Sequence, residues 1–366
     1  MKKSLLFLAS AALVLASCNN DVTLDENKNV VDPNQPKEIS FSTYAHTAKH
    51  AKAYAPVADA VFPTDYHFYI AAYSVNGGGD YFDKSEYARE GVSGNTWSGI
   101  ADNKQYWPLS PDTLNFLAVT KAGASTTTFG NTGANYASKV VVNLVDNRTA
   151  QHDLMYSYKR ADVTKGVGNA LVFNGGSNVA MEFHHAQAWV YFTVIAGDDA
   201  TAGAGLVVTG IQLKQAVYNG TATVNLANYN LKDDEHLLSA TLAWDGTAYG
   251  SATKYNVDVP TNGGAFVNVD VDDYENAIDA GDGLMIVPNP NKTDEELDPS
   301  FTTFVVSYTL NGKAYTFEYT PTAAQKQMMP GYKYNFNITF TLHEIKVNAT
   351  VDEWDEVENG VDIPAV

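Results

Sequence analysis

The sequence predicts an all-β fold made of two tandem antiparallel β-sandwich domains, and three observations support this prediction. Apolar and polar residues alternate over many short segments, which is typical of strands with one buried face. Turn signals such as Asn-Gly and Gly-Gly separate these segments, and no long 3.6-residue pattern competes with them. Aromatic residues make up 12% of the chain, led by 22 tyrosines, and this composition favours strands over helices.

Length, charge and cysteine content narrow the class of protein. A chain of 366 residues is long enough for two domains or for one large all-β unit. The formal net charge is −19. This acidity argues against nucleic acid as a partner, because phosphate binding needs clustered Lys and Arg. A single cysteine excludes an intramolecular disulfide and cysteine-based metal sites.

That cysteine ends a segment with the features of a secretion signal. Lys2 and Lys3 precede an apolar stretch at 5–15, which is too short to span a membrane. A Leu-Ala-Ser-Cys motif then ends at Cys18 and resembles the lipobox of bacterial lipoproteins. The resemblance implies a signal peptide over 1–17, acylation of Cys18 with chains such as palmitate, and anchoring in the outer membrane. An ordinary signal peptide with a chance cysteine is the alternative.

A flexible tether is predicted between this cysteine and the folded part. Residues 18–37 are rich in Asn, Asp, Pro and Lys and contain few large apolar side chains, as linkers do. Asp21, Asp25 and Glu26 place acid close behind the lipid. In the Bacteroidetes such acid resembles a surface-export signal of lipoproteins, while a solvated acidic linker explains it equally well.

The folded part is expected to divide near a cluster of turn residues. The N-terminal domain would span 38–178 and the C-terminal domain 179–366. The clearest strand is predicted at 332–342, where apolar residues occupy every even position and polar residues every odd one. We expect this strand to be central in the C-terminal domain, with Phe336 fully buried.

Two further regions have strong local signals. Alternating residues on both sides of Asn311-Gly312 predict a hairpin, because a type I′ turn needs positive φ at both central positions. The run 38–45 predicts the first strand of the N-terminal domain. The residues that would share one face of this strand are Ile39, Phe41, Thr43 and Ala45.

The residue patterns give no support to an enzyme, a cofactor or a metal site. His184 and His185 lie in a strand-like run, so they would point to opposite faces and could not chelate one ion directly. We expect one of them to be packed and the other exposed. Hydrolase, phosphate-binding and dinucleotide-binding motifs are missing from the sequence. The many paired carboxylates fit solubilising loops better than a glycosidase cleft.

Several aromatic motifs follow one another in a recognisable order. Together with the lipobox and the first strand, this order resembles the fimbrillin-like pilins of the Bacteroidetes, also called Mfa-like proteins, which build type V pili. We expect Trp97, Tyr106, Trp107 and Trp354 to pack in the core. The motifs are Trp97, Tyr106-Trp107-Pro108, Leu114-Asn115-Phe116-Leu117-Ala118, Asp153-Leu154-Met155-Tyr156, Phe183-His184-His185-Ala186, Gly331-Tyr332-Lys333-Tyr334 and Trp354.

The resemblance implies a structural fimbrium subunit with a role in cell adhesion, and not an enzyme. Such pilins are exported as lipoproteins to the outer membrane surface. A trypsin-like protease then cuts behind the first strand, and the terminal strand of a neighbouring subunit fills the groove that this strand leaves. Partners would be other pilus subunits, in a homopolymer or a heteropolymer.

Lys49 and Lys52 are the candidate processing sites, as the only Lys or Arg between Lys37 and Lys84. Neither is Arg, which departs from the best-known members of the family and leaves cleavage open. The candidate donor strand is 361–366. Shaft, tip, and uncleaved anchor or accessory roles also stay open.

Two further interpretations complete the prediction. Asp112-Thr113-Leu114 resembles the O-glycosylation sequon of this phylum and makes Thr113 a candidate glycosylation site, although Thr113 could equally be a plain turn residue. The alternative function is a surface glycan-binding lipoprotein, because outer-membrane glycan-uptake systems also use lipoprotein β-sandwiches with exposed aromatic platforms.

Overall fold

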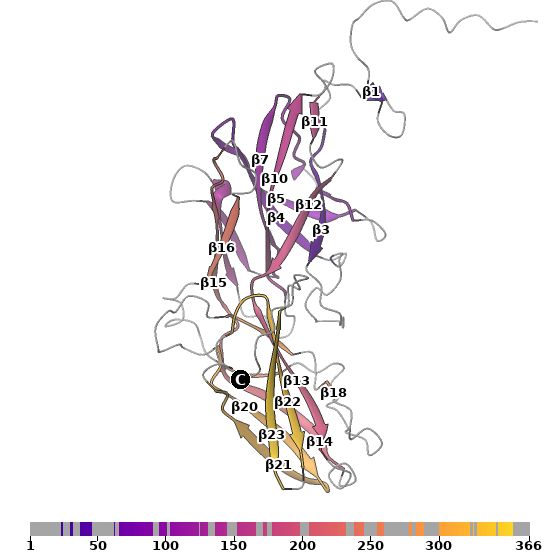
Figure 1. The fold of residues 1–366 in the computed structure, drawn as a ribbon, viewed down its shortest axis with the longest axis vertical. Coiled ribbons are helices and arrows are strands. Elements are labelled where there is room, and N and C mark those ends of the chain that lie inside the picture. Colours follow the sequence, from indigo (N-terminus) through magenta and orange to yellow (C-terminus); the bar gives the residue numbers. More distant parts are fainter. Residues whose placement is uncertain are drawn as a thin grey trace, which may run out of the picture.

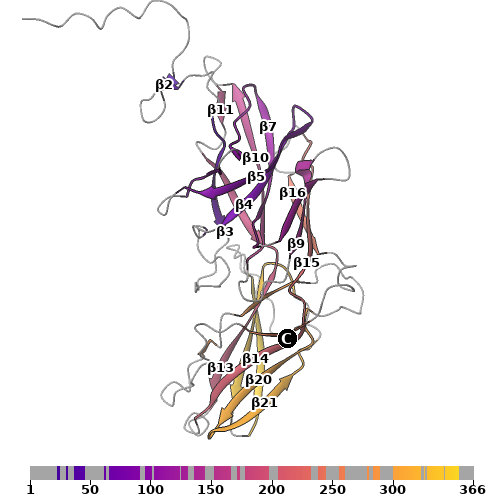
Figure 2. The same cartoon turned by 180° about the vertical axis from the view of Figure 1, so that it is seen from behind.

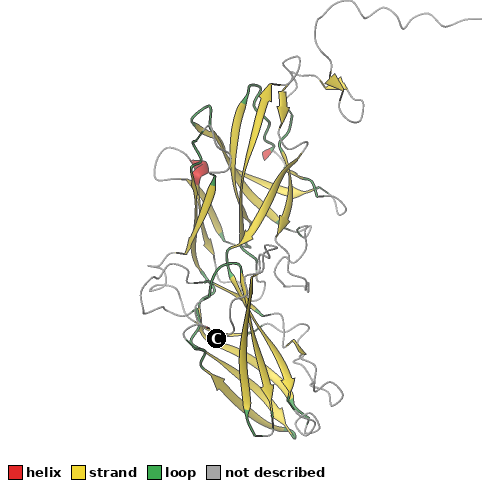
Figure 3. Ribbon diagram, in the orientation of Figure 1, coloured by secondary structure: helices red, strands yellow, loops and turns green. Residues whose placement is uncertain are grey.

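The structure is a computed structural model, and its described part consists mainly of strands and includes a short 3₁₀ turn, Tyr136–Ser138 (Figure 1, Figure 3). The all-β prediction is confirmed. Residues of the predicted tether form a small pair of strands, β1 (Thr23–Leu24) and β2 (Val30–Val31). The described residues are 23–24, 30–31, 37–45, 62, 66–90, 95–100, 103–123, 125–130, 136–144, 152–165, 171–173, 178–197, 205–231, 238–244, 255–259, 278–279, 283–288, 300–322, 325, 328–341 and 343–353.

The N-terminal strands form one sheet that closes on itself. Its order is β11-β10-β12-β3-β6-β5-β4-β7, and β7 also pairs with β10, so seven strands surround a common interior. A sandwich would consist of two separate sheets in this region, so the predicted N-terminal sandwich is not confirmed. The pairing of β3 with β12 is parallel, which also differs from the prediction. The strands are β3 (Ser40–Ala45), β4 (His67–Ser74), β5 (Gly79–Arg89), β6 (Trp97–Gly99), β7 (Asp112–Thr120), β10 (Met155–Lys165), β11 (Leu171–Phe173) and β12 (Asn178–His185).

This closed sheet, called the barrel below, has an aromatic interior. Ring contacts cross it from strand to strand, because alternate residues of every strand point inward. Trp97 and Trp107 are buried there, as predicted, whereas Tyr106 is 41% exposed and the prediction of a core position for it is wrong. Adjacent residues of an extended segment face opposite sides, so Tyr106 points out where Trp107 points in. Trp354 lies outside the described residues.

A second sheet packs on the outside of the barrel wall (Figure 2). Its order is β16-β15-β9-β8, and an apolar cluster from β4, β7, β9 and β15 fills the interface. Two of its strands precede β12 in the chain and two follow it. The division of the chain at residue 178 stays a prediction. The strands are β8 (Thr126–Gly130), β9 (Lys139–Leu144), β15 (Gly220–Ala227) and β16 (Ser239–Trp244).

Two more sheets face each other in the C-terminal part, below the barrel in Figure 1. One has the order β18-β13-β22-β23 with β19 beside β13, and the other β17-β14-β20-β21. Phe192, Phe304 and Phe336 meet between them, with ring centroids 4.9–5.6 Å apart. The strands are β13 (Ala188–Ala196), β14 (Val207–Ala216), β17 (Tyr255–Asp258), β18 (Ile278–Asp279), β19 (Leu284–Ile286), β20 (Thr303–Leu310), β21 (Lys313–Tyr319), β22 (Tyr332–Phe340) and β23 (Ile345–Glu353).

The two strongest local predictions for this part are confirmed. β22 lies between β13 and β23, and Phe336 is 0% exposed. Asn311 and Gly312 connect β20 to β21 with φ values of 53° and 70°. Positive φ at both positions is what a type I′ turn requires.

Candidate functional site

Strand β3 is the first strand of the barrel along the chain, and it completes the closed sheet. It runs parallel to β12 from the pair Ser40 and Asn178 to the pair Ala45 and Phe183. On its other side it meets β6 at one position, Phe41 opposite Trp97. Because the sheet is closed, β3 has a neighbour on both edges, and its loss would leave two unpaired edges facing each other.

The inward face of β3 is fully buried. Ile39, Phe41 and Thr43 are each 0% exposed, so the predicted alternation is confirmed for these three residues. Ser40 and Ser42 point outward and are half-buried. The side chain of Ala45 lies outside the described part.

Phe41 packs against three aromatic rings across the interior of the barrel. Its ring centroid lies 5.9 Å from Phe68, 4.9 Å from Tyr87 and 5.3 Å from Phe116, each at 82–84°. Such edge-to-face pairs stabilise beyond the area that they bury. We call Phe68, Tyr87 and Phe116 the aromatic socket.

The side chain of Asn95 replaces a backbone neighbour along the second edge of β3. Its Nδ2 donates to the Thr43 carbonyl oxygen at 2.8 Å, and its Oδ1 accepts from the Thr43 backbone N–H at 3.0 Å. The Thr43 hydroxyl lies 3.3 Å from the same Oδ1. The Trp97 indole N–H also donates to this oxygen, at 3.2 Å. One amide group therefore satisfies the buried backbone of Thr43 where β6 does not reach.

A short extended segment, residues 104–107, holds the chain just before β3; we call it the latch. The Ile39 N–H donates to the Gln105 carbonyl at 2.8 Å, and the Trp107 N–H donates to the Lys37 carbonyl at 2.9 Å. Gly99 allows the latch to approach β6, because a Cβ at that position would lie 2.6 Å from the backbone oxygen of Asn103.

Side chains reinforce the latch. Lys104 Nζ lies 2.7 Å from Glu38 Oε2, and this contact raises the pKa of Lys104. The Tyr87 hydroxyl donates to the Ile39 carbonyl at 3.3 Å. Burial raises the pKa of Tyr87, and the charge of Glu38 adds to this effect, so the phenol stays protonated as a donor.

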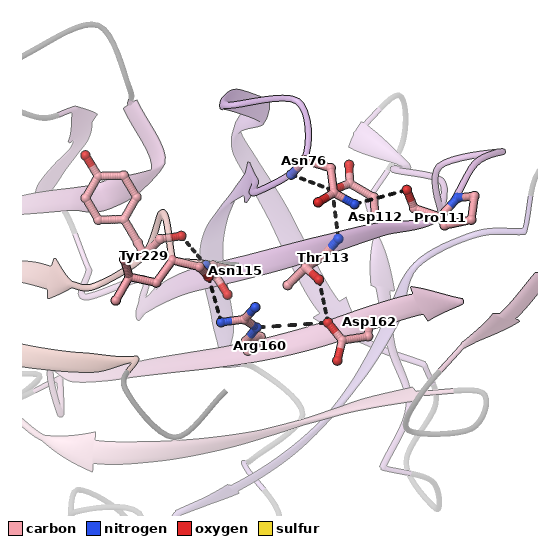
Figure 4. Close-up of polar contacts among 9 residues, drawn as sticks. Asn76, Pro111, Asp112, Thr113, Asn115, Arg160, Asp162 and Tyr229 are labelled. Atoms are coloured by element: carbon pink, nitrogen blue, oxygen red, sulfur yellow. Dashed lines mark hydrogen bonds and ion pairs between the residues drawn. The ribbon is translucent and has the colours of Figure 1, made fainter. Parts of the chain in front are cut away.

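The other predicted site residues fall in different places. Cys18, Lys49 and Lys52 lie outside the described residues, although Lys49 and Lys52 follow β3 closely in the sequence. Thr113 is half-buried at the start of β7 and not in a turn. Its hydroxyl donates to Asp162 Oδ1 on β10 at 2.6 Å (Figure 4). Glycosylation of Thr113 stays a prediction.

Asp112 of the same tripeptide fixes the turn between β4 and β5. Its Oδ1 accepts from the backbone N–H groups of Thr113, at 2.7 Å, and Asn76, at 3.1 Å. Its Oδ2 accepts from the Ser74 hydroxyl at 2.6 Å. Satisfying these turn donors gives Asp112 a structural role that the sequon alone does not indicate.

Next to Thr113, polar side chains attach the second sheet to the barrel (Figure 4). Asn115 of β7 donates to the Tyr229 carbonyl, and Arg160 of β10 donates to the Leu231 carbonyl at 3.0 Å. The Tyr229 ring packs edge-on against Tyr73, with centroids 4.9 Å apart. No local sequence pattern indicates this contact, because the turn after β15 is far from β7 and β10 along the chain.

The adjacent histidines point to opposite faces, as predicted. His185 is buried, and its Nδ1 lies 2.9 Å from Asp153 Oδ2, with both side chains 0% exposed. His184 is half-buried and packs against the rings of Tyr156 and Tyr158, so the prediction that the second histidine is exposed is wrong. No group of three or more His, Cys, Asp or Glu residues within the described ranges could hold a metal ion. Over the same residues, no helix has the length and apolarity to cross a membrane.

The sequence profile described as fimbrillin-like matches residues 55–354. A fimbrial protein from Bacteroides vulgatus has a similar structure, with a TM-score of 0.49 and 14% identity over 86% of this chain and 99% of that one. The tip fimbrial protein Mfa3 from Porphyromonas gingivalis, truncated at its C-terminus, gives a TM-score of 0.42 and 10% identity over 87% and 100%. No curated protein sequence matches the chain.

Proposed function

This chain belongs to the fimbrillin-like family, and on that premise we propose that it is a structural fimbrial subunit, exported as a lipoprotein acylated at Cys18 and assembled by strand exchange. One observation carries the proposal. The first strand of a closed sheet, β3, is buried on its inner face and joined to the rest of the barrel only by non-covalent contacts and by the chain that follows it. A single cut behind β3 would therefore make it exchangeable.

The geometry of the barrel suggests how the exchange would occur. Cleavage at Lys49 or Lys52 by a trypsin-like protease leaves β3 held by hydrogen bonds and apolar contacts alone. Its departure exposes the edges of β12 and β6 and the apolar trough between them. Unpaired edges with an apolar floor are what β-strand addition uses, so a strand from a neighbouring subunit takes the place of β3.

Before cleavage the same geometry keeps the subunit apart from its neighbours. While β3 is covalently attached, its effective concentration at its own place in the barrel is high, and a strand from another molecule cannot compete. The uncut protein would thus reach the cell surface as a monomer, anchored in the outer membrane by the lipid on Cys18 and lifted away from it by residues 18–37.

Exchange of a labelled strand tests the proposal. The protein is treated with mild trypsin and incubated with a fluorescent peptide of residues 37–45, and uptake is followed by gel filtration. We expect the cut protein to take up the peptide slowly and the uncut protein to take up none. The matched control combines Lys49→Ala and Lys52→Ala, which should block both the cut and the uptake. Equal uptake by cut and uncut protein, or none by either, contradicts strand exchange.

Lipidation has its own test. Cys18→Ala should leave the protein without acyl chains, and it should move from the membrane fraction to the soluble one and out of the detergent phase in a partition assay. Ser17→Ala, next to the cysteine, serves as the control and should stay with the membrane. Unchanged partitioning of the Cys18 variant rules out the lipoprotein part of the proposal.

A further inference from the structure

The residues around β3 favour particular side chains in any strand that takes its place. The aromatic socket comes from β4 and β7, on the wall opposite β3, and from β5, which follows β6 in the sheet, and all three of its rings are 0% exposed. Phe68 and Tyr87 also stack on each other at 5.6 Å and 9°, a contact that does not involve Phe41. A donor strand without an aromatic side chain would leave the socket partly empty, and an unfilled cavity in a close-packed interior destabilises strongly.

Asn95 adds a polar contact at position 43 of β3, two residues after the position that fills the socket. The Trp97 indole can only donate, and its bond to the Oδ1 of Asn95 does not involve β3. That oxygen then faces the backbone N–H and the hydroxyl of residue 43. A donor with a hydroxyl side chain here gains a hydrogen bond that a purely apolar strand lacks.

Asn178 makes the equivalent contact on the outer face of β3. Its Oδ1 accepts from the Ser40 hydroxyl at 2.5 Å, while its Nδ2 donates to the Thr96 hydroxyl at 3.2 Å. The two asparagines lie on opposite edges of β3, one before β6 and one in β12. Together with the socket they define a register: hydroxyl, aromatic, then hydroxyl at positions 40, 41 and 43.

The candidate donor of this chain does not match that register. Residues 361–366 read Val-Asp-Ile-Pro-Ala-Val and contain neither an aromatic nor a hydroxyl side chain, and the proline lacks a backbone N–H. The aromatic residue before them, Trp354, has Asp352 and Glu356 two positions away on either side. In a strand these carboxylates share its face, and burial beside the socket would be strongly unfavourable.

We propose that the barrel is a sequence-selective acceptor, which takes an extended strand with an aromatic side chain in the socket and a hydroxyl-bearing residue two positions away, supplied by a different kind of subunit and not by residues 354–366 of a second copy. The socket, Asn95 and Asn178 are its specificity-determining residues. This inference rests on the proposed strand exchange and identifies the partner strand by its chemistry.

Peptide competition tests the selectivity. A site-specific protease sequence is inserted between Lys49 and Lys52 of the full chain, and after the cut, unlabelled peptides compete with labelled 37–45. The 37–45 peptide with Phe41→Ala should bind at least about 100-fold more weakly, and Thr43→Val about three- to tenfold more weakly. The 354–366 peptide should not compete at a 100-fold excess. Competition by 354–366 within threefold of the 37–45 peptide overturns the proposal, as does unaltered affinity of both substituted peptides.

Acceptor variants separate recognition from a general loss of structure. Asn95→Ala should abolish the affinity difference between the unmodified peptide and its Thr43→Val form, and keep the difference between the unmodified peptide and its Ser40→Ala form. Asn178→Ala should do the reverse. A variant that merely weakens the fold would lower all affinities by the same factor, and that result contradicts a role in recognition. Because the unmodified 37–45 peptide is present in every series, its failure to rebind identifies a failure of strand exchange itself, whereas equal binding of all peptides refutes selectivity alone.

Discussion

The two central strands β3 and β22 are built alike but held differently. Each pairs in parallel with the strand that lies beside it, β3 with β12 and β22 with β13. β22 is also paired along its whole length with β23, from Tyr332 to Phe340. The second edge of β3, in contrast, meets β6 at Phe41 alone and is completed by Asn95 and the latch.

This difference supports β3 as the strand that leaves in the proposed exchange. Removing β22 would break two continuous rows of strand pairing, with β13 and with β23. Removing β3 from the barrel exposes two edges and an apolar trough at once, a site with the shape of the missing strand. The discontinuous second edge means that fewer backbone hydrogen bonds must break together. The proposed exchange therefore concerns the barrel, and the C-terminal sheets are expected to stay intact.

The largest effect is expected in the C-terminal core. Phe336→Ala should lower the free energy of unfolding by about 3–5 kcal/mol, because the ring is 0% exposed and packs against Phe192, Phe301 and Phe304. The change in the free energy of unfolding is measured by urea denaturation, monitored by circular dichroism. Strand exchange of the cut protein should be unchanged. An accelerated exchange would show that the barrel and the C-terminal sheets are not independent, and it would contradict the difference between β3 and β22.

A smaller effect is expected at the discontinuous edge of β3. Asn95→Ala leaves the backbone of Thr43 without its partners and should cost about 1–3 kcal/mol. Urea denaturation should show the lower free energy of unfolding, and β3 should leave the cut protein faster. The control is Asn348→Ala, an exposed asparagine of β23, with an expected change below about 0.5 kcal/mol. Similar losses from both substitutions would mean that Asn95 does not hold the strand.

The smallest effect is a pH dependence on the barrel wall. Burial raises the pKa of Glu86, but hydrogen bonds from Lys121 at 2.8 Å and His67 at 2.7 Å outweigh it, and the pKa is lowered from its usual 4.5. A carboxylate with a lowered folded-state pKa stabilises the fold above its usual value, and this contribution disappears as the pH falls through the folded-state pKa.

Glu86→Gln should therefore remove part of the acid sensitivity. Unfolding measured between pH 7 and pH 3 should show a difference under about 1 kcal/mol at pH 7 that vanishes toward pH 3. The matched control is Glu318→Gln, whose partner Lys214 lies at 2.7 Å on an exposed edge of the C-terminal sheets; its effect should be weaker. A pH-independent difference for the Glu86 variant would rule out the ion pair as the cause.

Local pattern predicted the strands but not their closure. Alternation placed Ile39, Phe41 and Thr43 on one buried face, and Asn311-Gly312 marked a hairpin that the structure confirms. Closure of the barrel depends on the pairing of β7 with β10 and of β3 with β12, strands far apart in the sequence. No residue pattern within one strand records its partner, so a sandwich and a closed sheet look alike from the sequence.

The site was predictable only where it depends on local pattern. The first strand was expected, with its buried face, from residues 38–45 alone. The role of Asn95 could not be foreseen, since an asparagine in a Gly- and Ser-containing segment normally indicates a turn. Tyr106 could have been placed correctly, because consecutive residues of an extended segment cannot both face the core.

A reversible lock on β3 tests the central claim most directly. In a Cys18→Ser background, Ser42→Cys and Ala180→Cys stand directly opposite on β3 and β12, at the spacing that a disulfide needs. The matched control, Ile195→Cys with Thr339→Cys, locks β13 to β22 in the same parallel register. After the cut behind β3, the oxidised β3 lock should block uptake of the labelled 37–45 peptide and the reduced form should restore it, while the control takes up peptide in both states. Uptake by the oxidised β3 lock at the rate of the reduced form would contradict the exchange of β3.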